Sequence, residues 1–144
     1  MGSFSDTPAL LANGNVSPFR FIKIDATSSS ANTYDNQGVQ VDSAIDNVVG
    51  VSDGSTKSAT SSLHAEANDP ITLQGGDVVL VECGGAVARG SRVQADSSGK
   101  AITAVVTAGP AFRYQGYVAL EAGASGRIIR IAKNGGMVYF PTTL

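Results

Sequence analysis

The apolar positions of this chain fall into short segments that are separated by glycine-rich or polar turns. Residues 19–27 (FRFIKIDAT) are rich in residue types that favour strands. Residues 77–83 (DVVLVEC) form an apolar run between two glycine pairs, which is typical of a strand buried on both faces. Turn signals recur about every 8–12 residues, and no sustained amphipathic stretch predicts a helix. The pattern predicts an all-β fold, a small Gly-rich β-barrel or sandwich.

The sequence predicts the other strands and turns, some with clear boundaries and one segment with two alternatives. Residues 39–51 allow two strands with one helical turn between them. The sequence Asp96-Ser-Ser-Gly99 is a hairpin-type turn that joins the strands on either side of it. Further strands are predicted over residues 63–67, 86–95, 100–107, 112–121, 127–132 and 137–140.

The chain divides into a short arm and one domain. Its 144 residues fit a single domain, since a domain takes about 150 residues. Residues 1–18 contain Pro8, Asn13-Gly14 and Pro18 and show no periodicity, so we expect a flexible N-terminal arm. Residues 19–144 are predicted to form a single β domain.

Charge and composition exclude several classes of partner. The net charge is −2, with no basic excess of the kind that nucleic-acid binding requires, so no nucleic-acid partner is expected. No apolar run approaches the roughly 20 residues that span a bilayer, and the first residues lack the pattern of a signal peptide. We therefore expect no membrane partner, and a protein of the cytoplasm or of a particle assembled there.

The chain offers little catalytic chemistry. His64 is the only histidine and Cys83 the only cysteine, so a His-rich or all-Cys metal site is impossible within one chain. Cys83 ends an apolar strand, where a buried structural thiol is favoured, and His64 is expected at a half-exposed strand position. The Gly75-Gly76 and Gly84-Gly85 pairs lead into no helix, so tight turns are favoured over phosphate loops. We expect no catalytic residue, cofactor or metal, and a protein that is not an enzyme.

One segment resembles a known family. Gly76-Asp-Val-Val-Leu-Val81 opens it, and Gly85-Ala-Val-Ala-Arg-Gly-Ser-Arg-Val93 and Asp96-Ser-Ser-Gly-Lys-Ala101 follow. Gln115-Gly-Tyr-Val-Ala-Leu-Glu-Ala-Gly-Ala-Ser-Gly-Arg-Ile-Ile-Arg-Ile131 closes it. Residues 75–131 are similar to the small β-barrel domain of tailed-bacteriophage capsid cement, or head decoration, proteins. Residues 1–74 show no such likeness.

The resemblance implies a non-enzymatic virion protein, assembled in the host cytoplasm, on the outer surface of the phage head. Such proteins form homotrimers that clamp neighbouring subunits of the major capsid protein. The arm and the C-terminal aromatic segment are then candidates for contact with the capsid or a neighbouring subunit. The candidate interface residues are Phe4, Leu10, Leu11, Phe19, Tyr139 and Phe140.

Two other functions stay open. A phage tail or fibre accessory module, or a carbohydrate-binding β module, would suit the same composition. A sugar binder should expose two or three aromatic residues on one face, and only Tyr34, Tyr114, Tyr117 and Tyr139 are available as tyrosines. A small β enzyme would need a cleft with converging polar groups.

Overall fold

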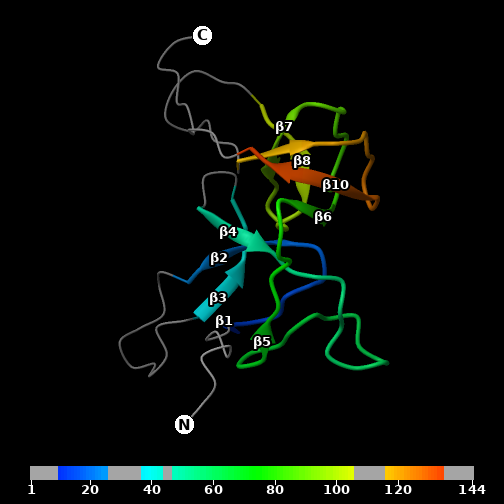
Figure 1. Ribbon diagram of the computed structural model, residues 1–144. Helices are drawn as coiled ribbons and strands as arrows, with labels where there is room; N and C mark the ends of the chain where they lie inside the picture. Colours follow the sequence, from blue (N-terminus) through cyan, green and yellow to red (C-terminus); the bar gives the residue numbers. More distant parts are fainter. Residues whose placement is uncertain (1–9, 26–36, 44–46, 106–115, 135–144) are drawn as a thin grey trace.

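The fold is all-β, as the sequence predicts. A computed structural model describes residues 10–25, 37–43, 47–105 and 116–134, and places ten strands in two five-stranded sheets. The first sheet occupies the lower half of Figure 1 and the second sheet the upper half. The strands are β1 (Leu10–Ala12), β2 (Phe21–Ile24), β3 (Gln37–Gln40), β4 (Val48–Val51), β5 (Pro70–Ile71), β6 (Val78–Glu82), β7 (Arg92–Ala95), β8 (Ala101–Thr103), β9 (Tyr117–Ala119) and β10 (Ile128–Lys133).

The first sheet curls until its two edges meet. Its order is β4-β2-β3-β1-β5, with β1 parallel to β3 and the other pairs antiparallel. Beyond β5, Leu73 forms a bridge with Ser52, and Gln74 N–H donates to Val51 O at 2.9 Å. The edge strands β4 and β5 are thereby joined through their extensions. We call this unit, residues 10–74, the N-terminal barrel.

The second sheet closes in the same way. Its order is β6-β10-β9-β7-β8, all antiparallel. Cys83, just after β6, forms a parallel bridge with Ala101 of β8, and Gly84 N–H donates to Ala101 O at 2.9 Å. The extension of β6 thus covers the free edge of β8. We call residues 77–134 the C-terminal barrel.

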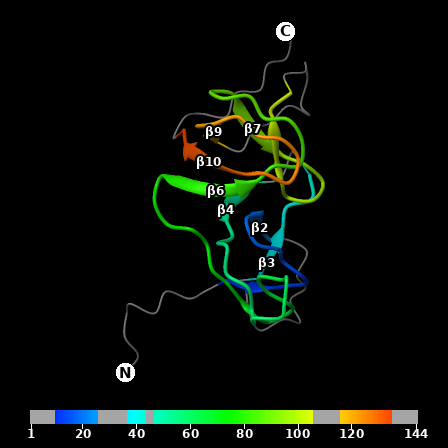
Figure 2. The same cartoon turned by 90° about the vertical axis from the view of Figure 1, so that its right-hand side faces the viewer.

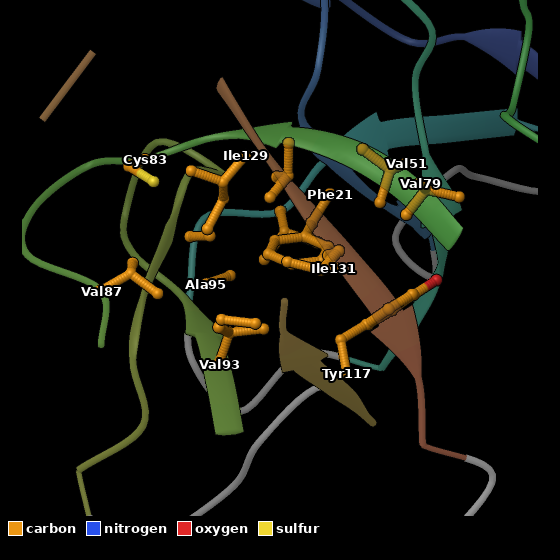
Figure 3. Packing of buried hydrophobic residues seen from close by; sticks show 14 residues of the cluster. Phe21, Val51, Val79, Cys83, Val87, Val93, Ala95, Tyr117, Ile129 and Ile131 are labelled. Carbon is orange, nitrogen blue, oxygen red and sulfur yellow. The ribbon is translucent and has the colours of Figure 1, made fainter. Parts of the chain in front are cut away.

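Strand β2 is a wall shared by two cores. Neighbouring residues of a strand point to opposite faces, and both Phe21 and Ile22 are fully buried. Ile22 belongs to the small core of the N-terminal barrel, with Ala12, Val16, Ala65 and Ile71. Phe21 belongs to the larger core of the C-terminal barrel, where its ring lies 5.7 Å from that of Tyr117. Figure 3 shows Phe21 surrounded by side chains of the C-terminal strands.

The tip of the β7–β8 hairpin fastens the two barrels together. Gly99 O accepts the N–H of Phe21 at 2.9 Å. Gly99 has φ +71°, and an added Cβ would lie 2.8 Å from Gln40 Cγ and 3.0 Å from Val41 O. This position requires glycine for both reasons, because a side chain would be strained and would collide with the N-terminal barrel.

Part of the expected N-terminal arm is not an arm. Leu10–Ala12 form β1, between β3 and β5, and Val16 forms a bridge with Ala65. Ala12 and Val16 are buried in the N-terminal core, so their burial holds this segment in the barrel. The expectation of a flexible arm over residues 1–18 is therefore wrong for residues 10–18, while residues 1–9 lie outside the described residues.

Several strand predictions also need correction. The run at residues 77–83 is buried on one face only, because β6 covers the barrel with Val79 and Val81 and leaves Val78 and Leu80 exposed. Residues 63–67 supply a single bridge, at Ala65, instead of a strand. Residues 39–51 contain the end of β3 and all of β4, and the helical turn expected over residues 43–47 has its centre, residues 44–46, outside the described residues. The strand expected over 112–121 is present as β9, with residues 112–115 outside the described residues, and the strand expected over 137–140 lies wholly outside them.

Candidate protein-binding surface

The six candidate interface residues are not gathered on one surface of the described structure. Leu10 packs against the small core of the N-terminal barrel, and an added Cβ on Gly38 would lie 3.3 Å from Leu10 Cδ1. Its half-buried side chain supports the barrel, and its interface role stays a prediction. Leu11 is half-buried on the same strand, and its interface role stays a prediction. Phe4, Tyr139 and Phe140 lie outside the described residues.

Phe19 joins the two barrels through its backbone. Its carbonyl accepts the N–H of Glu82 at 3.1 Å, and its N–H lies 3.4 Å from Asp53 O. Its φ is +57°, which is unusual for a residue with a side chain. The half-buried ring lies against Gly54, where an added Cβ would stand 2.4 Å from Phe19 Cζ. Phe19 thus makes intramolecular contacts with both its backbone and its ring.

Three of the four large exposed apolar side chains in the described part of the C-terminal barrel gather on the outside of β6 and β10, and the fourth, Val105, lies elsewhere. Val78 is 51% exposed, Leu80 39% and Ile128 41%. Val78 lies opposite Ala132, which lies opposite Val118 on β9, so one apolar row crosses three strands. Figure 1 shows β6 and β10 side by side, and Figure 2 shows β6 between the N-terminal barrel and the rest of the C-terminal barrel. We call this surface the outer face, defined by Val78, Leu80, Val118, Ile128 and Ala132.

Sequence reasoning missed the outer face although the sequence carried a signal for it. The run VVLV predicts a strand buried on both faces, whereas only its alternate residues Val79 and Val81 face the core. A barrel strand whose outer residues face solvent would ordinarily alternate apolar and polar positions. Apolar residues at both faces of an antiparallel edge strand therefore signal either a covering layer or a binding surface.

The backbone at this edge is already occupied. The amide of Gln74 spans Leu80: Gln74 Nε2 donates to Leu80 O at 2.7 Å, and Leu80 N–H donates to Gln74 Oε1 at 2.8 Å. The next outward-facing N–H, that of Glu82, is bonded to Phe19 O. Addition of a partner's strand to β6 is blocked at these residues, so a partner meets the side chains of the outer face.

A charge cluster stands where β6 approaches the N-terminal barrel. Glu82 Oε1 lies 3.1 Å from an Arg20 guanidinium nitrogen, and Glu82 Oε2 lies 3.0 Å from Lys100 Nζ. Partial burial acts to raise the pKa of Glu82, but the hydrogen bonds and charges of Lys100 and Arg20 outweigh it and lower that pKa. The ionised cluster ties the segment before β2, the edge strand β6 and the β7–β8 hairpin to one another.

The residues singled out for chemistry have structural roles. Cys83 is buried in the C-terminal core, where burial raises the pKa of its thiol, so it is a poor nucleophile. His64 is buried, not half-exposed as expected: Nδ1 lies 2.8 Å from Ser55 O, and Nε2 accepts the N–H of Thr72 at 3.0 Å. The ring therefore fastens the 53–64 loop to the chain beyond β5.

The described part of the chain contains neither a cluster of metal-ligating side chains nor an exposed aromatic surface for a sugar. Within it, no group of three or more His, Cys, Asp or Glu side chains is placed to hold a metal ion. Its three aromatic residues form no exposed platform, because Phe21 and Tyr117 are buried and Phe19 is half-buried. These same residues form no helix that is long and apolar enough to cross a membrane.

Comparison with known proteins gives little more. No family model matches the chain, and no curated protein matches it either. Among solved structures, the chain is similar to the head fibre gp8.5 N base of bacteriophage phi29, with a TM-score of 0.48 and 12% sequence identity. The likeness covers 87% of this chain and 90% of that one.

Proposed function

We propose that this chain is a non-enzymatic capsid decoration, or cement, protein of a tailed phage. It binds the outer surface of the head as a homotrimer and stabilises contacts between subunits of the major capsid protein. The single observation that carries the proposal is the exposed outer face on β6, β9 and β10. It lies almost entirely within residues 75–131, the segment that resembles the cement proteins.

The physical argument starts from the cost of exposing that face. Each Å² of apolar surface removed from water contributes about 25 cal/mol of favourable free energy. Burial of Val78, Leu80 and Ile128 against another protein is therefore favourable. Because Gln74 and Phe19 occupy the neighbouring strand edge, the contact is made by side chains and does not extend the sheet. A trimer repeats such a contact, and several weak contacts made together bind tightly through their high effective concentration.

The test is binding to expanded, empty capsids of the source phage, measured by co-sedimentation. The wild-type chain is expected to saturate the capsids at a fixed stoichiometry. Leu80→Glu places a charge in the outer face and should reduce binding at least about tenfold, since a buried unpaired charge is costly. Val105→Glu is the matched control, because Val105 is 56% exposed just beyond β8 and outside the outer face.

The outcomes separate the proposal from its alternatives. Equal loss of binding in both variants, or wild-type protein that never binds capsids, contradicts the cement function. Protein that ignores capsids and binds glycans supports a carbohydrate-binding module instead. The role expected for Phe4 is tested by deleting residues 2–9, whereas a deletion of residues 2–18 would also remove β1 and with it part of the N-terminal barrel.

A further inference from the structure

The turn after β1 contains an Asn-Gly pair that is open to solvent. Asn13 and Gly14 are both exposed, between Ala12 in the N-terminal core and Val16 at its bridge with Ala65. Gly14 has φ +118°, and an added Cβ there would meet nothing within 4 Å. Within the part of the chain that the structure describes, the Gly14 N–H makes no hydrogen bond. The pair therefore combines solvent access, open space and a backbone nitrogen without a partner.

A carboxylate lies against the side chain of this asparagine. Asn13 Nδ2 donates a hydrogen bond to Asp25 Oδ2, and Asp25 is only 8% exposed. Strand β3 holds both backbones in place. Gly38 O accepts the N–H of Asn13 at 3.0 Å, and Gln37 O accepts the N–H of Asp25 at 2.9 Å. The Asp25 carboxylate is thus fixed beside the amide nitrogen of Asn13.

We propose that Asn13 is a site of self-modification in the folded protein, where the asparagine becomes isoaspartate or aspartate without an enzyme. The Gly14 nitrogen gives its proton to water and attacks Asn13 Cγ, which closes a five-membered succinimide ring. The Cγ–Nδ2 bond breaks, and Nδ2 leaves as ammonia after taking a proton from water. Water then opens the ring at either carbonyl. The sum of the steps consumes one water and releases one ammonia.

Asp25 assists the departure of the ammonia. The nitrogen leaves only after it has gained a proton, and at that moment it carries positive charge. An adjacent carboxylate stabilises this charge through a charge-assisted hydrogen bond. Because Asp25 is largely shielded from water, the attraction between the two charges is stronger than it would be in solution.

The same turn contains a second asparagine that serves as an internal comparison. Asn15 is exposed as well, but the residue that follows it is the β-branched Val16. Val16 is buried in the N-terminal core, and its N–H donates to Ala65 O at 2.8 Å. The nitrogen that would attack Asn15 is therefore bonded and held in place. We expect Asn13 to react and Asn15 to stay unchanged.

The modification weakens the N-terminal barrel. It removes the hydrogen bond from Nδ2 and places a second carboxylate beside that of Asp25, and like charges in contact repel each other. Isoaspartate also adds a carbon atom to the backbone, next to the bond between Asn13 and Gly38 that holds β1 against β3. The change is irreversible and is independent of capsid binding, so this inference and the cement function can fail separately.

The first experiment follows each asparagine of the purified full chain by peptide mass mapping. Samples are incubated in neutral buffer, folded or in urea, and isoaspartate is identified with protein isoaspartyl methyltransferase. Asn13 should give both isoaspartate and aspartate, at least as fast in the folded protein as in urea. Asn15 should stay unchanged in the folded protein. The other Asn-Gly pair of the sequence, Asn134-Gly135, is measured in a separate peptide.

Two variants test the role of Asp25. Asp25→Asn keeps the size of the side chain and removes its charge, so it should slow the conversion of Asn13 severalfold in the folded protein and leave the rate in urea unchanged. Asp42→Asn is the matched control, because Asp42 pairs with Lys23, and it should convert like the wild type. Far-UV circular dichroism identifies a variant that has failed to fold. In that case the comparison of folded and urea samples of the wild type still decides the matter.

A third pair of variants tests the effect on the barrel. Asn13→Asp reproduces one of the two products and should unfold at a lower temperature than the wild type. Asn15→Asp adds the same charge two residues away and should shift the unfolding temperature less. Both are measured by thermal unfolding followed by circular dichroism.

Four results would overturn the inference. Conversion that is far slower in the folded protein than in urea would show that the fold protects Asn13. Aspartate without isoaspartate would exclude the ring. An unchanged rate in a folded Asp25→Asn variant would remove Asp25 from the reaction. Equal unfolding temperatures of Asn13→Asp and the wild type would show that the conversion does not weaken the barrel.

Discussion

The two barrels have the same number of strands but very different interiors. The C-terminal barrel encloses a cluster of large side chains, including Ile129, Ile131 and Tyr117, whereas the N-terminal core contains two alanines among its five buried members. The interior of the N-terminal barrel is tightly packed: an added Cβ on Gly38 would lie only 3.2 Å from Ile71 Cδ1. The larger core is not self-sufficient, because it takes Phe21, Val41 and Val51 from the N-terminal barrel. We therefore expect the two barrels to unfold together although each has its own closed sheet.

The largest effect is expected from truncating the residue that both barrels share. Phe21→Ala leaves a cavity beside Tyr117 and should reduce the free energy of unfolding by about 3–5 kcal/mol, as Phe-to-Ala changes do in cores. Urea unfolding followed by circular dichroism measures it. If Phe21→Ala does not fold, Phe21→Leu should show a smaller loss with the same single transition.

Ile22→Ala is the matched change on the other face of β2. It should cost about 2–5 kcal/mol and also give one transition, because the two cores share the strand. Two separate transitions in either variant would show that the barrels are independent domains.

The next effect is expected at the hairpin tip. Gly99→Ala should cost about 2–4 kcal/mol, because alanine is strained at φ +71° and its Cβ would press on Val41 O. Gly90→Ala is the control: its φ is +81°, but an added Cβ would meet nothing within 4 Å. Gly90→Ala should lower the free energy of unfolding only through backbone strain, by about 1 kcal/mol. Equal losses in thermal unfolding would mean that the hairpin tip does not join the barrels.

A smaller, pH-dependent effect is expected from the charge cluster. Since the folded pKa of Glu82 is lowered, its stabilising contribution is present above the unfolded value of 4.5 and is lost as the pH falls through the folded pKa. Glu82→Gln should cost about 1–2 kcal/mol at pH 7. In acid the stability of wild type and variant should converge. Unfolding measured between pH 3 and pH 7 tests this, and a constant difference across that range would contradict it.

The smallest effect is expected at the strand edge. Gln74→Ala frees the Leu80 N–H and C=O and should cost about 1 kcal/mol or less, because water replaces the lost bonds. Amide hydrogen exchange should quicken at Leu80. Gln94→Ala is the control, since Gln94 Oε1 accepts the N–H of Val105 on the other side of the barrel. Unchanged exchange at Leu80 would mean that Gln74 does not close this edge.

The sequence predicts local features better than distant ones. The Asp96–Gly99 turn is confirmed because its chemistry is local: Asp96 Oδ1 accepts the N–H of Ser98 at 2.8 Å and that of Lys100 at 3.0 Å. Strand β1 was missed because its partners, β3 and β5, are far along the chain and nothing in Leu10–Ala12 specifies a parallel pairing with β3. A three-residue strand is too short to show a period.

The candidate surface was harder to predict than the fold. The alternation of β6 is invisible in a run of uniformly apolar residues, so only the pairing with β10 shows which side chains face out. The Arg20–Glu82 ion pair joins residues 62 positions apart, beyond the reach of spacing rules. The opposite net charges of residues 1–76 (−5) and 77–144 (+3) appear only when the chain is divided at the Gln74–Asp77 turn, and that division comes from the sheet topology.

The position of Phe21 has a consequence for synthesis on the ribosome. Phe21 emerges early, yet the residues that enclose it include Ile129 and Ile131, which are among the last described residues to emerge. The larger core can therefore close only when most of the chain has been made, and contacts between such distant segments form slowly. Until then apolar strands stay exposed to other chains.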